Sequence, residues 1–375
     1  TSPMFYHSTY ELNSSSGVVI TGSHTPANYN GFKIVFNNHS TSSEEILHLK
    51  QRILEENFRE GKGASKKEDI KESYINRILE SINLNKNLNI SIDCGNGAAG
   101  VVAKEVYERL GCNVIELHGE LNGSFPNHHP DPSKLENMED LIKSVKENDS
   151  VVGLAFDGDA DRLGVISPKG EMIFPDRQMI MFSRQVIQSS PNAKIVFDVK
   201  CSKLLSDEIE RLKGKPLICK TGHTFIKQKI RETDALLGGE MSGHIFFNDR
   251  WPGFDDGIYA GARMLEIIAN SEQDDSFETV PNMLSTPEIN IPAADEEKFQ
   301  IVKTFIENSN FNDAKIVSID GIRVEFEKGW GLLRPSNTSP CLVLRFEAET
   351  NDDLNKIKEI FYLGLKSIKP NINKF

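Results

Sequence analysis

The sequence predicts an α/β protein built from repeated units and closed by an α+β unit. Short apolar runs typical of strands surround a Gly-containing polar loop three times, and these loops are residues 21–30, 157–162 and 238–243. Segments with apolar residues at i, i+3 and i+4 separate the strands, which is the helical period. Strands that alternate with helices are typical of α/β layers.

The predicted helices follow the chain in order. They are residues 43–58, 103–110, 140–148, 203–212 and 352–368. A second internal similarity supports a repeat: the strands LNISID and AKIVFD end in Asp93 and Asp198, 105 residues apart, and each precedes a helical pattern. That separation is about one domain length, so we predict two related units.

Polar stretches suggest where the units end. FREGKGASKKEDIKES suits a first boundary and NSEQDDSFETVPNML a last one, and after the latter three strand patterns are followed by one helix. We therefore predict four domains, namely 1–69, 70–171, 172–283 and 284–375. The chain opens at Thr1 with helix or strand material that lacks a start signal, so we expect part of the first domain to precede it.

Composition excludes several classes of partner. The 375 residues carry 43 Lys and Arg against 55 Asp and Glu, a net charge of −12. This balance argues against nucleic acid and acidic membranes, while a local basic pocket could still hold a small anion. No apolar run approaches the roughly 20 residues that a membrane helix needs. The five scattered cysteines, without CxxC spacing, predict reduced thiols in a cytoplasmic protein.

The loop DGDADR places Asp157, Asp159 and Asp161 at every second position after an apolar strand. Like charges this close repel, and a divalent cation would relieve them. An EF-hand is excluded because Arg162 and Pro168 stand where its Gly and Glu are required. The dehalogenase-type pattern Asp-x-Asp-x-Thr/Val also fails at Asp161. An oxygen-only Mg²⁺ site completed by phosphate remains, with an Asx-rich turn as the alternative.

The loop TGSHTP carries Ser23 after the strand GVVIT, without a Gly-x-Ser-x-Gly elbow. Alone it indicates a polar turn, but a phosphorylated Ser23 would supply the phosphate oxygen for the aspartate loop. Lys33 follows ten residues later and could act in acid–base chemistry or as a charge partner.

Two further loops carry polar side chains that suit the binding of a sugar and of a phosphate. In GEMSGH, Glu240 and Ser242 would face one side of an extended loop, which suits a sugar. RPSNTSP combines an Arg fork with short polar side chains, which suits a phosphate. Its members are Arg334, Ser336, Asn337 and Thr338. An ordinary turn is the alternative for each loop.

The pair His128 and His129 in FPNHHPDP could indicate zinc. Adjacent histidines diverge in direction, and no third ligand is evident in the sequence. We therefore interpret the pair as structural.

Together, TGSHTP, DGDADR, GEMSGH and RPSNT resemble, in this order, the four signature loops of the α-D-phosphohexomutase superfamily. The likeness is strongest to the bacterial phosphomannomutase/phosphoglucomutase group. It extends to DCGNGAAG, FDVKC, KTGH and RWPGFDDGIYA, and so covers nearly the whole chain. The resemblance implies three similar mixed α/β domains around a central cleft plus a C-terminal α+β domain, with one loop in each.

The resemblance also implies roles for individual residues. Ser23 would carry the phosphoryl group and bind magnesium together with Asp157, Asp159 and Asp161. Charge stabilisation and proton transfer would involve His24, Lys33, Arg162 and His244. Substrate would contact Lys200, His223, Glu240, Met241, Ser242, Gly243, His244, Arg334, Pro335, Ser336, Asn337 and Thr338.

The implied reaction interconverts hexose 1-phosphate and hexose 6-phosphate through a bisphosphorylated sugar. A site that binds the O3 and O4 hydroxyls makes no contact at C2, where glucose and mannose differ. Both sugars would therefore be substrates. Hexose 1,6-bisphosphate would act as activator, and the enzyme would be a cytoplasmic monomer. Two departures stand out: Thr25 replaces the usual Asn, and the chain lacks the domain part expected before Thr1.

Three alternatives remain open. A phosphoglucosamine mutase usually carries a different residue at the position of Met241. A metal-dependent phosphatase would hydrolyse phosphosugars instead of isomerising them. An inactive phosphosugar-binding fragment would bind them without turnover.

Overall fold

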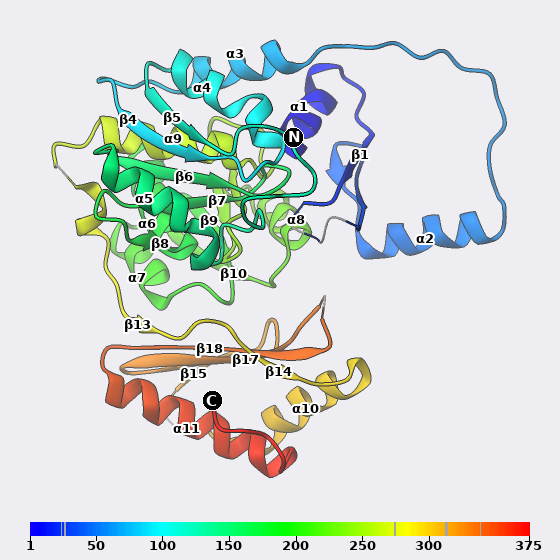
Figure 1. Ribbon diagram of the computed structural model, residues 1–375. Helices are drawn as coiled ribbons and strands as arrows, with labels where there is room; N and C mark the ends of the chain where they lie inside the picture. The colour runs from blue at the N-terminus through cyan, green and yellow to red at the C-terminus, as the bar shows by residue number, and fades with distance from the viewer. Residues whose placement is uncertain (24, 26–27, 274, 312–313, 338) are drawn as a thin grey trace.

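The computed structural model describes residues 1–23, 25, 28–273, 275–311, 314–337 and 339–375. These residues form four sheets, each built from one continuous stretch of the chain. The first three sheets and their helices make the upper body in Figure 1, and the fourth lies below it. Among the described helices, none has both the length and the apolar character needed to cross a membrane.

The first unit is an antiparallel sheet with order β1-β2-β3. Its elements are α1 (Ser2–Glu11), β1 (Gly17–Thr21), β2 (Gly31–Phe36), β3 (His39–Ser40) and α2 (Ser43–Leu54). A capping box starts α2: the Ser42 hydroxyl accepts from the Glu45 N–H, while the Glu45 carboxylate accepts from the Ser42 N–H. In Figure 1, α2 lies apart from the body, and an irregular connection returns across the top to the next helix.

The second unit has sheet order β5-β4-β6-β7-β8. Its elements are α3 (Lys71–Ser81), β4 (Asn89–Asp93), η1 (Ala98–Val101), α4 (Ala103–Arg109), β5 (Asn113–Leu117), η2 (Leu135–Met138), α5 (Glu139–Glu147), β6 (Val152–Phe156), β7 (Leu163–Ile166) and β8 (Met172–Ile173). Strand β4 pairs in parallel with β5 and β6, whereas β6 and β7 are antiparallel. DGDADR is therefore the connection of a hairpin between two buried strands.

The third unit repeats this plan with order β10-β9-β11-β12. Its elements are α6 (Pro175–Ser189), β9 (Lys194–Asp198), α7 (Lys203–Arg211), β10 (Lys215–Cys219), α8 (His223–Thr233), β11 (Leu237–Gly239), β12 (Ile245–Phe247), α9 (Gly257–Ala269) and η3 (Ser276–Thr279). The equivalent strands β4 and β9 end in Asp93 and Asp198, which confirms the repeat predicted from the sequence. GEMSGH occupies the hairpin position that DGDADR holds in the second unit.

The fourth unit is an antiparallel sheet with two helices on one face (Figure 1). Its elements are β13 (Leu284–Ser285), β14 (Ile289–Pro292), α10 (Asp295–Asn308), β15 (Lys315–Val317), β16 (Ile322–Phe326), β17 (Gly329–Pro335), β18 (Cys341–Ala348) and α11 (Asn351–Ile368). The pattern analysis predicted neither α10 nor β17. Strand β17 begins GWG, and glycine weakens strand propensity, but every residue of β17 is buried between its neighbours.

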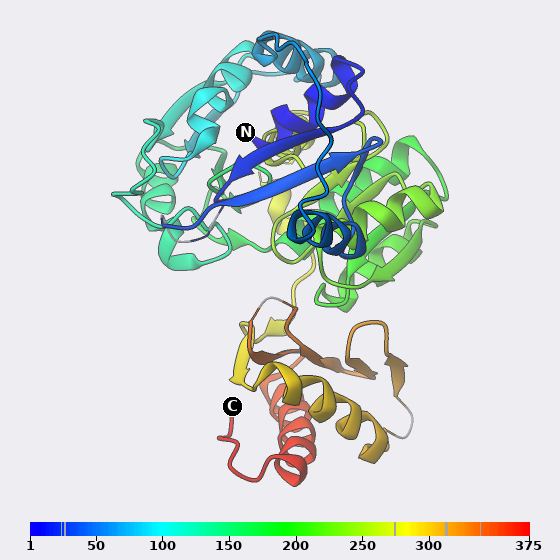
Figure 2. The same ribbon diagram turned by 90° about the vertical axis from the view of Figure 1, so that its right-hand side faces the viewer.

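One apolar core joins the second and third units, and the fourth has its own. Buried polar contacts connect the fourth unit to the third. Arg345 Nη2 donates to Asp176 Oδ2 at 3.1 Å, and Ser202 Oγ donates to Glu347 Oε2 at 2.7 Å. Figure 2 shows β1 and β2 crossing the face of the upper body, with the fourth unit beneath. The domain boundaries themselves stay a prediction.

Candidate active site

The aspartate loop, residues 157–162, is held by its own backbone. Asp157 Oδ1 accepts from the N–H groups of Asp161 and Arg162, at 3.1 and 3.2 Å. This folds the loop so that the carboxylates of Asp157, Asp159 and Asp161 offer oxygens within 4.8 Å of one another. All three side chains are buried, so each charge needs a partner.

The cations Lys33, on β2, and Arg162 face these carboxylates, and Arg162 Nε lies 3.8 Å from Asp157 Oδ2. Lys33 makes the shorter contacts. It forms ion pairs with Asp161 and, at 2.6 Å, with Asp159. Burial alone would raise the pKa of Asp159, but Lys33 outweighs burial and lowers it. Burial, together with the charges of Asp161 and Asp159, raises the pKa of Asp157 well above its ordinary value. Ionisation of Asp157 is therefore unfavourable in this cluster.

The donor set fits a hard divalent cation. Asp159 Oδ1 and Asp161 Oδ1 are buried and have no hydrogen-bond partner among the residues that the structure describes. Carboxylate oxygens are the ligands that Mg²⁺ prefers. Bound there, a divalent ion would satisfy these oxygens and favour the ionised form of Asp157.

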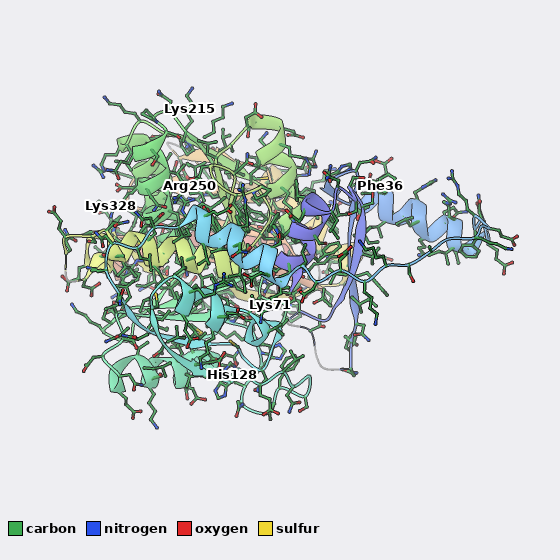
Figure 3. The ribbon with its side chains drawn as sticks, turned by 90° about the horizontal axis from the view of Figure 1, so that it is seen from above. Phe36, Lys71, His128, Lys215, Arg250 and Lys328 are labelled. Carbon is green, nitrogen blue, oxygen red and sulfur yellow. The ribbon has the colours of Figure 1, made fainter. Side chains whose placement is uncertain are left out.

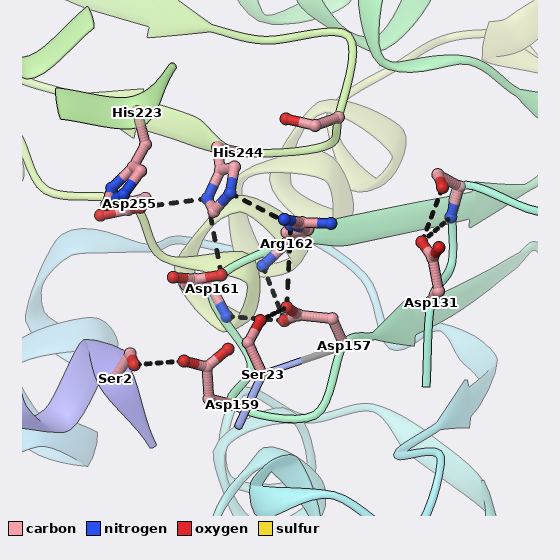
Figure 4. A network of polar contacts seen from close by, with 12 residues as sticks. Ser2, Ser23, Asp131, Asp157, Asp159, Asp161, Arg162, His223, His244 and Asp255 are labelled. Carbon is pink, nitrogen blue, oxygen red and sulfur yellow. Dashed lines mark hydrogen bonds and ion pairs between the residues drawn. The ribbon is translucent and has the colours of Figure 1, made fainter. Parts of the chain in front are cut away.

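Ser23 reaches this cluster from the turn after β1. Its Oγ donates to Asp157 Oδ2 at 2.8 Å (Figure 4), and its N–H donates to Thr21 Oγ1 at 3.0 Å. The approach depends on Gly158, because a Cβ there would lie 2.1 Å from the Ser23 carbonyl oxygen. A cavity of about 360 Å³ beside the contact is lined in part by Ser23 and Asp159. His24 lies outside the described residues.

Arg162 and His244 join the aspartate loop to the third unit. Arg162 Nε donates to His244 Nε2 at 3.1 Å, and His244 Nδ1 lies 3.0 Å from Asp255 Oδ2 (Figure 4). The His223 ring stacks on His244 with centroids 5.4 Å apart. Burial would lower the pKa of His244, but the nearby carboxylates of Asp161 and Asp255 raise it overall. His244 is thus suited to holding a proton beside the carboxylates.

The sugar loop, residues 240–244, places Glu240 and Ser242 together, as their spacing predicts. Ser242 Oγ donates to Glu240 Oε2 at 3.4 Å, and Glu240 Oε1 accepts from the Gly222 N–H at 2.5 Å. The Met241 N–H donates to Asp198 Oδ1 at 3.3 Å, and Gly243 adopts φ +98°. Glycine tolerates that left-handed conformation, which lets the loop turn sharply.

The fourth loop lies between β17 and β18 and faces the third unit. Arg334 Nε donates to Asp320 Oδ2 at 2.9 Å, and Asn337 Nδ2 donates to the Thr221 carbonyl at 3.4 Å. Arg334 Nη2 is buried without a hydrogen-bond partner among the described residues, so it remains available to an anion. Pro335 ends β17, Ser336 follows it, and Thr338 is outside the described residues.

A larger cavity of about 710 Å³ lies where the second, third and fourth units meet. Its lining includes Met241 and Ser242 of the sugar loop and Lys200, whose Nζ is paired with Glu288 Oε1 at 2.6 Å. Predicted substrate contacts from the sugar loop and from the connection after β9 therefore line the same cavity.

Family models match the chain in four consecutive segments. They describe phosphoglucomutase/phosphomannomutase alpha/beta/alpha domain I over residues 1–60, domain II over 72–170, domain III over 174–283 and the C-terminal domain over 288–363. The chain belongs to the phosphoglucomutase/phosphomannomutase family. The resemblance to the α-D-phosphohexomutase superfamily is therefore confirmed, together with its three α/β domains and C-terminal domain.

Members of this phosphoglucomutase/phosphomannomutase family resemble the chain over almost its whole length. A phosphomannomutase/phosphoglucomutase of Pseudomonas syringae pv. tomato is 48% identical over 373 residues, which cover 99% of this chain and 80% of the relative. A phosphoglucomutase of Neisseria gonorrhoeae is 44% identical, covering 98% and 81%. The crystal structure of a family protein from Burkholderia thailandensis superposes with a TM-score of 0.92 at 43% identity, covering 96% and 78%.

In this family member, the sequence analysis missed the acidic residues that hold the predicted site residues in place. Asp255 contacts His223, Lys227 and His244, and Asp320 contacts Arg334. The signal for Asp255 is the pair of acids in RWPGFDDG, which the resemblance includes without assigning a role. Asp320 follows a strand pattern and carries no comparable signal.

Proposed function

We propose that this chain interconverts hexose 1-phosphate and hexose 6-phosphate, with mannose and glucose as substrates, through a phosphorylated Ser23. The observation that carries the proposal is the 2.8 Å contact between Ser23 Oγ and Asp157 within three buried carboxylates. A hydroxyl is otherwise a poor phosphoryl carrier, and phosphoryl transfer depends mainly on positioning and charge neutralisation. The names of the relatives support this reaction.

In the proposed reaction, the bond between phosphorus and Ser23 Oγ breaks as a bond forms from phosphorus to a sugar hydroxyl. The hydroxyl proton passes to a basic group of the site, for which His244 is the candidate. Lys33, which is already protonated, would donate a proton to Ser23 Oγ, so that Ser23 is left as a hydroxyl. Mg²⁺ held by Asp157, Asp159 and Asp161 would supply positive charge to the phosphoryl oxygens. His24 would add to this charge.

The bisphosphorylated sugar then turns end for end and returns its other phosphate to Ser23. Glu240 and Ser242 would bind O3 and O4, which glucose and mannose share. Lys200, His223, Met241, Gly243, Arg334, Pro335, Ser336, Asn337 and Thr338 would complete the contacts to sugar and distal phosphate. The proposal includes hexose 1,6-bisphosphate as activator and a monomeric, cytoplasmic enzyme.

The test replaces the phosphoryl carrier. Ser23→Ala should remove the phosphate adduct seen by intact-mass measurement and reduce mutase turnover by orders of magnitude. Ser14→Ala, an exposed serine just before β1, is the matched control and should keep both. A Ser23→Ala protein with normal turnover would require another phosphoryl carrier. Release of inorganic phosphate as the main product would instead support a phosphatase.

A further inference from the structure

A mixed histidine–aspartate cluster lies at one edge of the second unit. Asp93 ends β4, His118 follows β5, and His128 belongs to the long connection before α5. One ligand atom from each lies within 4.8 Å of the others. Figure 3 places His128 at the rim of this unit, distant from Phe36 on β2. Asp93 is buried, and the two imidazoles are 17% and 15% exposed, so an ion from solvent could reach them.

His128 is oriented with Nε2 toward Asp93. Its Nδ1 lies 3.0 Å from the His129 carbonyl oxygen, to which it donates, and its Nε2 lies 2.9 Å from Asp93 Oδ2. The hydrogen bond to Asp93 raises the pKa of His128 to about 8. His128 Nε2 and Asp93 Oδ2 therefore face each other directly, on either side of the position where a metal ion would bind both.

The other polar atoms of the cluster are already anchored. Asp93 Oδ1 accepts from the Gly95 N–H at 2.8 Å, and His118 Nε2 contacts Asp140 Oδ2 at 3.0 Å. The His118 and His128 rings meet edge to face, with centroids 5.2 Å apart. Carboxylates and carbonyls that hold the second nitrogen of an imidazole are characteristic of metal-ligating histidines.

We propose that Asp93, His118 and His128 bind a divalent transition metal, with Zn²⁺ as the best match, separately from the aspartate loop. Two imidazoles and one carboxylate are a ligand set that favours Zn²⁺ over Mg²⁺, which prefers oxygen. His118 would coordinate through Nδ1, because its Nε2 is bonded to Asp140. His129 is not part of the ligand set.

The site would have a structural effect on the phosphoryl centre. The residues after Asp93 pack against the aspartate loop, where the Ala98 N–H donates to the Gly158 carbonyl at 2.9 Å. Asn96, Gly97 and Phe125 line the cavity beside Ser23. A metal that joins the ends of β4 and β5 to the connection at His128 would hold this wall in place.

The experiment counts zinc on the full chain. Excess Mg²⁺ occupies oxygen-only sites, Zn²⁺ is added, and the bound zinc is measured by elemental analysis after gel filtration. The same proteins are titrated with Co²⁺, whose visible absorption reports imidazole ligands. The variants are His118→Gln, His128→Gln and Asp140→Asn. His48→Gln on exposed α2 is the control, and His244→Gln removes the other histidine-containing cluster, with Asp161 and Asp255.

We expect one zinc per chain in the unmodified protein and in the His48→Gln and His244→Gln variants. Affinity should fall at least tenfold in His118→Gln and His128→Gln, and by about tenfold in Asp140→Asn. Unchanged zinc in both His118→Gln and His128→Gln overturns the proposal, as does loss of zinc in His244→Gln alone. If His128→Gln disturbs the fold by circular dichroism, His118→Gln decides, because His118 contacts the exposed Asp140 whereas His128 contacts the buried Asp93.

Discussion

The first and second units meet at the contact between Ser23 and Asp157, yet they are built differently. In β6 every residue is buried, whereas β1 alternates between half-buried and exposed positions. Ile20 on β1 is 68% exposed, and Ile92 on β4 is fully buried. From the first unit, the main core includes only Tyr6 and Val35 among the described buried residues.

Polar contacts therefore position the first unit. Lys33 pairs with Asp159 and Asp161, and the hydroxyls of Ser2 and Thr21 both donate to Asp159 Oδ2, at 2.6 and 2.9 Å. The carboxylates proposed to bind the metal are thus also the groups that hold the first unit, including the turn with Ser23, against the second unit. The same carboxylate oxygens therefore hold the two units together and set the charge of the site.

The largest effect is expected from Lys33→Met, which leaves the buried carboxylates of Asp159 and Asp161 without their ion-pair partner on β2. Breaking a buried ion pair costs about 3–5 kcal/mol, so amide exchange in β1 and β2 should accelerate by more than a hundredfold while β4 stays protected. Added Mg²⁺ should restore part of the protection. The control is Lys50→Met on exposed α2. Unaltered exchange in β1 and β2 would show that apolar packing holds the unit.

A matched pair of isoleucines tests the difference in burial. Ile92→Ala should lower the free energy of unfolding by about 2–5 kcal/mol because it leaves a cavity in a packed core. Ile20→Ala should change it by less than about 0.5 kcal/mol because its side chain is already in water. Guanidinium unfolding of both variants measures this. Equal losses would contradict the comparison.

An acidic residue of the third unit should make stability depend on pH. Hydrogen bonds from Arg211 and Arg184 lower the pKa of Glu208 to about 2, against the opposing effect of burial. Since the folded pKa lies below the unfolded one, the stabilisation is complete above about pH 4.5 and is lost as the pH falls toward 2. Glu208→Gln should therefore cost about 1 kcal/mol at pH 7, allowing for solvent screening, and much less near pH 3.

The matched control is Glu60→Gln, an exposed residue in the irregular connection after α2. Its unfolding midpoint should stay the same at both pH values. A Glu208→Gln loss that is the same at pH 7 and pH 3 would show that packing, not charge, is responsible.

The smallest effect concerns two helix caps. Ser42 caps α2, and Ser202 caps α7 while also donating to buried Glu347. Removing a cap costs about 1 kcal/mol. Ser202→Ala should lower the global unfolding midpoint, whereas Ser42→Ala should only increase fraying of α2, which has no buried residue among those described. Amide exchange and urea unfolding distinguish the two outcomes, and a lower midpoint in Ser42→Ala would indicate that α2 packs on the body.

Local patterns in the sequence determined much of the fold and pointed to the loops that carry the proposed reactive groups. The 3.6-residue period identified α5, α7 and α11, because an amphipathic helix carries its signal within one segment. DGDADR and TGSHTP singled out the aspartates and Ser23 as candidates, because mutual repulsion and loop chemistry can be read from neighbouring residues. Strand β17 was missed, since its buried environment comes from other strands and not from its glycines.

The tertiary structure alone decided how distant residues pair. The sequence showed two histidines in HHPD and no third ligand, but folding brings His128 to Asp93, 35 positions away, and to His118. Asp255 likewise reaches His244 and His223 only because β12 and α8 bring them together. Each pairing depends on how far both side chains are removed from water and on how they are oriented toward each other. Both are set by the packing of separate elements, so no local sequence pattern encodes them. The sequence by itself determined which loops carry the proposed reactive groups. The tertiary structure decided which carboxylates contact those loops, because the partners lie on separate strands and connections.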